Sequence, residues 1–222
     1  MAHRKPRQLT LEKHAGWGGK RARSGRKPAG KKAMVSHAKR PLLTPRSPVH
    51  VTLRVLPHVW NLRSKRSFAV LRKAMSEGGN RLGLRLCDFS IQGNHLHLVV
   101  EADDSQSLSR GMQGLAIRAA LGLNRLMGRR GRVMSDRFHS RLLRTPNEVR
   151  RALHYVRGNH DIHRRRWGQV AVERPDEFSS TAPDHNVTLA APKSFLLKRA
   201  HHELGPPRVL TPRVVFRSLL RL

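Results

Sequence analysis

The 222-residue sequence predicts an α+β fold of the ferredoxin-like, split βαβ type, in which helices pack on one face of an antiparallel sheet. Two observations carry this prediction. Segments of alternating apolar residues and segments with apolar residues at helical spacing follow one another in the order β-α-β-β-α-β-α. The two consecutive strands in that order are separated by Gly93-Asn94, which is typical of a hairpin turn.

The first strand and the first helix are indicated by different periodicities. Residues 49–55 alternate between apolar and polar side chains, which predicts a half-buried strand. Ser64 can cap a helix that extends to about residue 75 and carries its apolar residues at helical spacing. A Gly-Gly-Asn sequence shortly after residue 75 predicts the end of that helix.

The remaining elements follow in the order that the fold class requires. Strands at about residues 82–91 and 95–101 form the predicted hairpin. Residues 107–127 carry a stripe of Leu, Met and Ala and predict a long helix. A weaker, strongly basic strand is expected at about residues 132–143, and Pro146 begins the last helix of the domain.

Composition divides the chain into three parts. Residues 1–47 are rich in Lys, Arg, Gly, Pro and Ser, and we expect them to form a disordered basic arm. Residues 48–167 hold most of the apolar side chains and form the folded domain. Residues 168–222 are expected to be a mostly irregular tail with a short apolar run near its end. No run approaches the roughly 18 apolar residues that a membrane helix needs, so we expect no membrane partner.

The charge of the chain indicates a polyanionic partner. The sequence has 45 Lys and Arg against 14 Asp and Glu, a formal net charge of +31. Such a chain repels itself unless counterions or a polyanion offset the charge, and nucleic acid is the natural partner. A general bias toward arginine is the alternative explanation. The single cysteine, Cys87, excludes an intramolecular disulfide and a cysteine-rich zinc site.

Two histidines in the third strand are the sharpest chemical feature of the sequence. Because side chains alternate along a strand, His95 and His97 project from the same face, with their Cα atoms roughly 7 Å apart. Two imidazoles held by a rigid strand provide half of a site for a divalent metal. The alternative is a pair of ordinary surface histidines. His50 lies on the strand face opposite Val49 and Val51, and we interpret it as a plain surface histidine, with a position at the border of the site as the alternative.

The last helix carries a possible nucleophile. Tyr155 is the only tyrosine in the chain, and Asn159 lies four residues later, on the same helical face. A helix packed over the sheet could present both side chains to the histidine pair. Tyrosine supplies a phenol for phosphoryl transfer, and asparagine supplies a neutral oxygen ligand. By itself, Tyr155 is better explained as an ordinary half-buried aromatic.

Taken together, these residues resemble the single-tyrosine HUH endonucleases, especially the REP-associated tyrosine transposases and their insertion-sequence relatives. HUH denotes His-hydrophobe-His, which in this sequence is His95-Leu96-His97. In that family the catalytic tyrosine lies on a late helix, as Tyr155 does, and the third metal ligand is a Gln or Asn four residues beyond it, as Asn159 is. The resemblance covers about residues 49–163 and includes neither end of the chain.

The resemblance implies a specific reaction. Mg²⁺ or Mn²⁺ would be held by His95, His97 and Asn159, and Tyr155 would attack a phosphate of single-stranded, hairpin-forming DNA to leave a 5′-phosphotyrosine. The phenol proton would pass to water or to a neighbouring histidine, for which His154 and His160 are candidates. The alternative function is a non-catalytic or domesticated single-stranded nucleic-acid-binding protein on the same fold.

The sequence departs from the family after the tyrosine. Many relatives have Asn-Pro there, whereas His160-Asp161 follows Asn159 in this chain. Asp161 and His163 therefore remain alternative third ligands. Ligand softness favours Mn²⁺ over Mg²⁺ at a two-histidine site, and zinc is disfavoured because no fourth nitrogen or sulfur ligand has a set spacing.

Arginines around the tyrosine would bind the DNA backbone, because the guanidinium group can contact a phosphate in two places and stack on bases. The candidates are Arg130, Arg132, Arg137, Arg141, Arg144, Arg150, Arg151 and Arg157. The family resemblance also implies a monomer or a homodimer that exchanges the tyrosine helix. We expect the protein in the cytoplasm of a prokaryotic cell, associated with the nucleoid.

Overall fold

The computed structural model describes residues 42–45, 47–166, 168 and 175–204, all of which belong to the compact unit Val35–Leu222. Most of the predicted basic arm and the apolar run near the end of the tail lie outside the described residues. The side chains of His163 and Arg166 also lie outside them. No helix among the described residues is long and apolar enough to cross a membrane.

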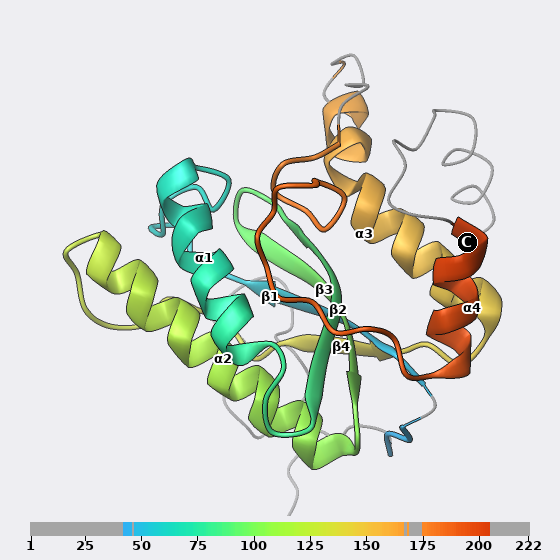
Figure 1. The fold of residues 1–222 in the computed structure, drawn as a ribbon. Coiled ribbons are helices and arrows are strands. Elements are labelled where there is room, and N and C mark those ends of the chain that lie inside the picture. The colour runs from blue at the N-terminus through green and yellow to red at the C-terminus, as the bar shows by residue number, and fades with distance from the viewer. Residues whose placement is uncertain (1–41, 46, 167, 169–174, 205–222) are drawn as a thin grey trace, which may run out of the picture. The chain divides into compact units, whose positions relative to one another are not determined.

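The described strands form one antiparallel sheet of four strands (Figure 1). The strands are β1 (Val49–Arg54), β2 (Leu84–Ile91), β3 (His95–Ala102) and β4 (His139–Leu142). Their order is β2-β3-β1-β4, so β3 lies between the two strands that the first helix connects. This arrangement is the split βαβ unit, and it confirms the predicted fold class. The strand β4 is much shorter than the predicted strand at residues 132–143.

The first two helices cover one face of the sheet. Helix α1 (Lys65–Gly78) begins after Ser64, whose side chain accepts a hydrogen bond from the Ser67 amide at 3.1 Å, as predicted for a cap. Helix α2 (Ser105–Leu126) lies beside α1 (Figure 1). Both helices contribute to the main hydrophobic core, which on the sheet side contains Leu96 and Leu98 of β3.

The prediction that the helices pack on one face of the sheet is wrong for α3 (Pro146–Arg166) and α4 (Phe195–Leu204). These two helices cover the opposite face, and Figure 1 shows them across the sheet from α1 and α2. A second apolar cluster joins Val99 of β3 to Leu153 of α3 and Leu197 of α4. The physical reason is that the second face of the sheet also carries apolar side chains, among them Cys87 of β2 and Val99 of β3, and α3 and α4 remove them from water.

The chain beyond residue 174 contributes more structure than the sequence analysis expected. The Ile91 amide donates to the Phe178 carbonyl at 2.8 Å and the Ser180 amide donates to the Phe89 carbonyl at 2.9 Å, so this segment covers the outer edge of β2. Helix α4 follows, and the buried Glu101 carboxylate of β3 accepts hydrogen bonds from the backbone near its start. These contacts join residues that are far apart in the sequence, so the local periodicity of apolar residues does not predict them.

Candidate functional site

A row of polar side chains crosses the sheet face that α3 covers. In the strand register, Ser90 of β2 lies opposite His97 of β3, His97 opposite Thr52 of β1, and Thr52 opposite His139 of β4. Directly opposed residues of antiparallel strands share a face, so these four side chains form one line across the sheet. The predicted histidine pair therefore lies in the middle of the sheet, under a helix.

The two histidines of β3 lie next to each other, as predicted, with ring centroids 4.7 Å apart. His97 is buried, and its Nδ1 atom lies 3.1 Å from Nε2 of His50 and 3.2 Å from Oγ1 of Thr52. His95 is half-buried, and its Nδ1 atom lies 2.7 Å from Oδ1 of Asn94. A carbonyl oxygen can only accept, so the proton of a neutral His95 is on Nδ1 and its Nε2 atom carries the lone pair that a metal requires.

Tyr155 of α3 lies against this histidine pair. The centroid of its ring is 5.1 Å from that of His97, with the two planes at 82°. The Tyr155 ring is also 5.9 Å from the ring of His50. Apolar residues on the same helix, among them Leu153 and Val156, are fully buried and hold α3 on the sheet. The structure thus brings together the phenol and the imidazoles within a single chain.

Asn159 lies one helical turn beyond Tyr155 and is fully buried. Within the part of the chain that the structure describes, neither Oδ1 nor Nδ2 of its side chain has a hydrogen-bond partner. A buried amide without partners costs on the order of 1–3 kcal/mol, and a bound water or ion is one way in which such a group is satisfied. The observation fits a metal ligand at this position.

The direction of α3 places Asn159 toward the His95 end of β3. His160, the next residue, has its pKa lowered by burial and then by the charge of Arg63, so its ring lies within electrostatic range of that guanidinium. Arg63 in turn donates to the carbonyl of Ile91 at 2.9 Å. Ile91 pairs with Leu96, the residue between the two histidines. The part of α3 that carries Asn159 and His160 therefore lies near the end of β3 where His95 is.

Two imidazoles and one amide oxygen are the candidate ligands for a metal. Among the described residues, no three side chains of His, Cys, Asp or Glu are placed together to hold a metal, so a metal at this site would need a third ligand of another type. Asn159 would be such a ligand. Asp161 lies six residues after Tyr155, which on a helix of 3.6 residues per turn is about 240° away from it. The side chain of the other alternative, His163, is not described.

His50 is the functional residue that the sequence analysis underestimated. It is half-buried, and its ring stacks on that of His97 with centroids 5.2 Å apart. Burial, followed by the charges of His139 and Arg141, lowers the pKa of His50 to about 4, so its ring is neutral at pH 7. Alternation places His50 and Thr52 on one strand face, but the register that sets them opposite β3 is not visible in the sequence.

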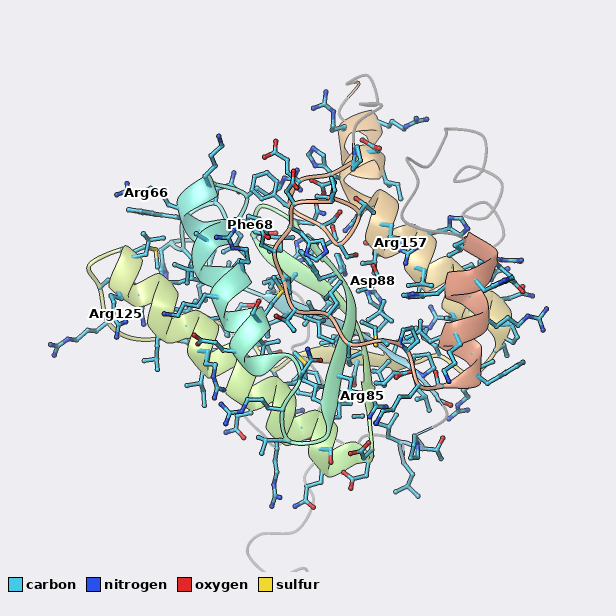
Figure 2. The ribbon with its side chains drawn as sticks, viewed as in Figure 1. Arg66, Phe68, Arg85, Asp88, Arg125 and Arg157 are labelled. Carbon is cyan, nitrogen blue, oxygen red and sulfur yellow. The ribbon has the colours of Figure 1, made fainter. Side chains whose placement is uncertain are left out.

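The structure corrects the assignment of Arg157 to DNA binding. Its side chain is only 7% exposed, and Nη2 lies 2.9 Å from Oδ2 of Asp88, which is itself buried on β2 (Figure 2). Ser180 donates to the same carboxylate, and Nε2 of His201 lies 3.1 Å from it. Arg157 therefore neutralises a buried carboxylate and anchors α3, and phosphate has no access to it.

The other predicted DNA-binding arginines are exposed, which is compatible with contact to a phosphate backbone. Several of them also make contacts within the protein: Arg141 lies 3.5 Å from Glu148, Arg132 donates to the carbonyls of Met134 and Ser135, and Arg150 donates to Oδ1 of Asn147 at 2.8 Å. Arg151 lies four residues before Tyr155 and shares its helical face. The exposed set is Arg130, Arg132, Arg137, Arg141, Arg144, Arg150 and Arg151.

Comparison with known proteins gives a distant structural likeness. No protein-family model and no curated protein matches the sequence. A REP-associated tyrosine transposase bound to a REP hairpin is similar over 61% of this chain and 76% of its own, with 14% identity and a TM-score of 0.48. A putative transposase from Deinococcus radiodurans R1 is similar over 62% of this chain and 98% of its own, with 12% identity and a TM-score of 0.38. At these identities and TM-scores, the likeness carries no inference about chemistry.

Proposed function

We propose that this protein is a transposase or nickase that cuts and rejoins single-stranded, hairpin-bearing DNA through a covalent bond to Tyr155. The observation that carries the proposal is the contact between the rings of Tyr155 and His97, 5.1 Å apart, on the face that also holds His95. A phenol beside a pair of imidazoles is the arrangement that metal-assisted phosphoryl transfer to tyrosine needs. The net charge of +31 supports a polyanionic substrate.

His95, His97 and Asn159 would hold the divalent metal, either Mg²⁺ or Mn²⁺. When bound, such a cation withdraws charge from the scissile phosphate and neutralises the charge that develops on its oxygens. Asn94 fixes the proton of His95 on Nδ1, which leaves Nε2 as the ligand atom. Asn159 would contribute its amide oxygen, which is buried and lacks a partner among the described residues.

The proposed reaction is a transesterification. The Tyr155 oxygen attacks the phosphorus in line with the bond to the 3′ oxygen, so that one phosphorus–oxygen bond forms while another breaks. The phenol proton passes to the departing 3′ oxygen, directly or through water. The products are a 5′-phosphotyrosine and a free 3′-hydroxyl. Attack by a second 3′-hydroxyl reverses the step and rejoins strands, and no nucleotide triphosphate is consumed.

Formation of a protein–DNA adduct that survives denaturation tests this proposal. The full chain is incubated with Mn²⁺ and a pool of hairpin-bearing single strands, and the adduct is measured on a denaturing gel. We expect adduct with Mn²⁺ and a loss of about 100-fold or more in a chelator, because the metal supplies several kcal/mol of stabilisation. Duplex DNA of the same sequences serves as the control substrate and should give none.

Two results of this assay would contradict the proposal. Tight binding of single strands without any adduct would identify a non-catalytic binding protein, the alternative on the same fold. An adduct that forms equally well in the presence of the chelator would exclude the metal at His95, His97 and Asn159.

Arg151 is expected to contact the DNA backbone beside the tyrosine. Replacing Arg151 with Ala should weaken binding of single-stranded DNA and reduce the slope of log K against log salt by about 0.7, the value for one released counterion on a single strand. Titrations at several salt concentrations measure this slope. Arg110→Ala is the matched control, because Arg110 is exposed on α2, across the sheet, and its loss should leave the slope unchanged.

An unchanged slope in the Arg151 variant would show that DNA does not follow this face of α3. An equal loss in both variants would indicate a response to net charge alone.

A further inference from the structure

We propose that His50 is a positioning residue that fixes the tautomer and the ring orientation of His97 for metal binding. The inference rests on the proposed function, because it assumes that His97 is a metal ligand. It assigns a role to a residue that neither the histidine-pair pattern nor the tyrosine helix contains.

The contacts of His50 restrict His97 in two ways. Its Nε2 atom lies 3.1 Å from Nδ1 of His97, within hydrogen-bond distance. Its ring also stacks on the ring of His97, with centroids 5.2 Å apart and planes at 26°. The hydrogen bond fixes the direction of the imidazole, and the nearly parallel neighbouring ring limits rotation of the His97 ring about its χ2 bond.

The protonation pattern follows from the bonding rules of imidazole. A neutral His97 that binds a metal through Nε2 must carry its proton on Nδ1, which then donates. His50, with Nε2 at 3.1 Å, would be the acceptor and would then carry its own proton on Nδ1. Thr52 Oγ1, at 3.2 Å from the same Nδ1 atom, is a second acceptor. His95 has the same arrangement, with the oxygen of Asn94 in the place of His50.

The position of His50 also links the metal site to the tyrosine. Its ring meets Tyr155 edge-on at 5.9 Å while it stacks on His97. The same imidazole therefore contacts both the proposed ligand and the proposed nucleophile. Strand pairing holds it there, because His50 is in register with Val99 of β3, two residues from His97.

The affinity of the full chain for Mn²⁺ tests this inference without DNA. Electron paramagnetic resonance distinguishes free from bound Mn²⁺, and it gives the dissociation constant for the wild type, His50→Phe, His50→Gln and His97→Ala. We expect His50→Phe to weaken binding by about 10- to 100-fold, the range for removal of a hydrogen bond to a ligand histidine. The Gln side chain places an amide oxygen near the position of Nε2, so His50→Gln should recover most of the affinity. A residue with only a packing role would show no such recovery.

His202→Phe is the matched control, because it removes an exposed imidazole from α4, outside the row of polar side chains that contains His97. It should bind Mn²⁺ as the wild type does. Wild-type affinity in His50→Phe, together with lost binding in His97→Ala, would overturn the role of His50 and leave the proposed metal site intact. If the wild type and His97→Ala bind Mn²⁺ equally, the metal site itself is wrong and the inference fails with it. Equal weakening in His50→Phe and His202→Phe, or no recovery in His50→Gln, would also overturn it.

Discussion

Replacement of Tyr155 with Phe is expected to reduce the denaturation-resistant protein–DNA adduct by at least about 10³-fold, to below detection, because the covalent bond is made by the phenol oxygen that this change removes. Tyr155 is the only tyrosine in the sequence, so no second phenol can replace it. The measurement is adduct yield on a denaturing gel with Mn²⁺ and labelled hairpin-bearing single strands.

The Phe variant also separates chemistry from binding. A phenyl ring can keep the edge contact with the His97 ring, so the helix should stay in place. We therefore expect the affinity for single-stranded DNA to change by less than about threefold, since an uncharged hydroxyl releases no counterion. An adduct of wild-type yield in this variant would eliminate Tyr155 as the nucleophile, and the proposed function would fall with it.

Replacement of Asp88 with Asn is expected to lower the free energy of unfolding by about 3–5 kcal/mol, because it leaves the buried guanidinium of Arg157 without a counter-charge. The side chain of Asp88 is 1% exposed, so water cannot offset the loss. Urea denaturation at neutral pH, analysed for the two-state midpoint and slope, measures the effect.

Two further variants show whether the ion pair is the cause. The double variant Asp88→Leu with Arg157→Met should recover most of the stability, because it removes both charges together. Asp103→Asn is the exposed control: Asp103 lies 3.0 Å from Arg85 but is 59% exposed, so its loss should cost under about 1 kcal/mol. Equal losses in Asp88→Asn and Asp103→Asn would contradict the importance of the buried pair.

The same carboxylate makes stability depend on pH. Burial alone would raise the pKa of Asp88, but the contact with His201, the charge and hydrogen bond of Arg157, and the Ser180 hydroxyl outweigh it and hold the pKa below 3.8. A pKa that is lower in the folded state gives stability that is fully present above the unfolded value and is lost as pH falls through the folded value. The wild type should therefore lose stability below about pH 4, and Asp88→Asn should lose less over that range.

The local features of the fold were predictable from the sequence. Alternation and helical spacing identified β1, β2, β3, α1, α2 and α3, and Ser64 was confirmed as a cap. Alternation also placed His95 and His97 on one face, and the structure has their rings in contact. These properties depend on neighbouring residues in the chain, and their periods are set by backbone geometry. The chemical roles of Tyr155, the two histidines and Asn159 stay predictions.

Contacts between distant segments were not predictable in the same way. The sequence analysis assigned Arg157 to DNA binding, because a local pattern does not show that Arg157 would pair with a buried Asp88. It expected all helices on one face, although Val99 already placed an apolar residue beside the histidines. Helix α4 was missed although it has local signals, because Ser194 accepts a hydrogen bond from the Leu197 amide as a cap and the buried Leu197 and Ala200 have helical spacing; only its anchor, the Glu101 carboxylate, lies in a different part of the chain.

The sequence by itself determined the order of the elements from β1 to α3, the common face of His95 and His97, and the presence of one phenol on a late helix, because each follows from a short-range period. Only the tertiary structure decided that His50 meets His97, that Tyr155 reaches both, and that Arg157 points inward. Strand register and helix packing determine these contacts, because both depend on how the apolar faces of all the elements are buried together.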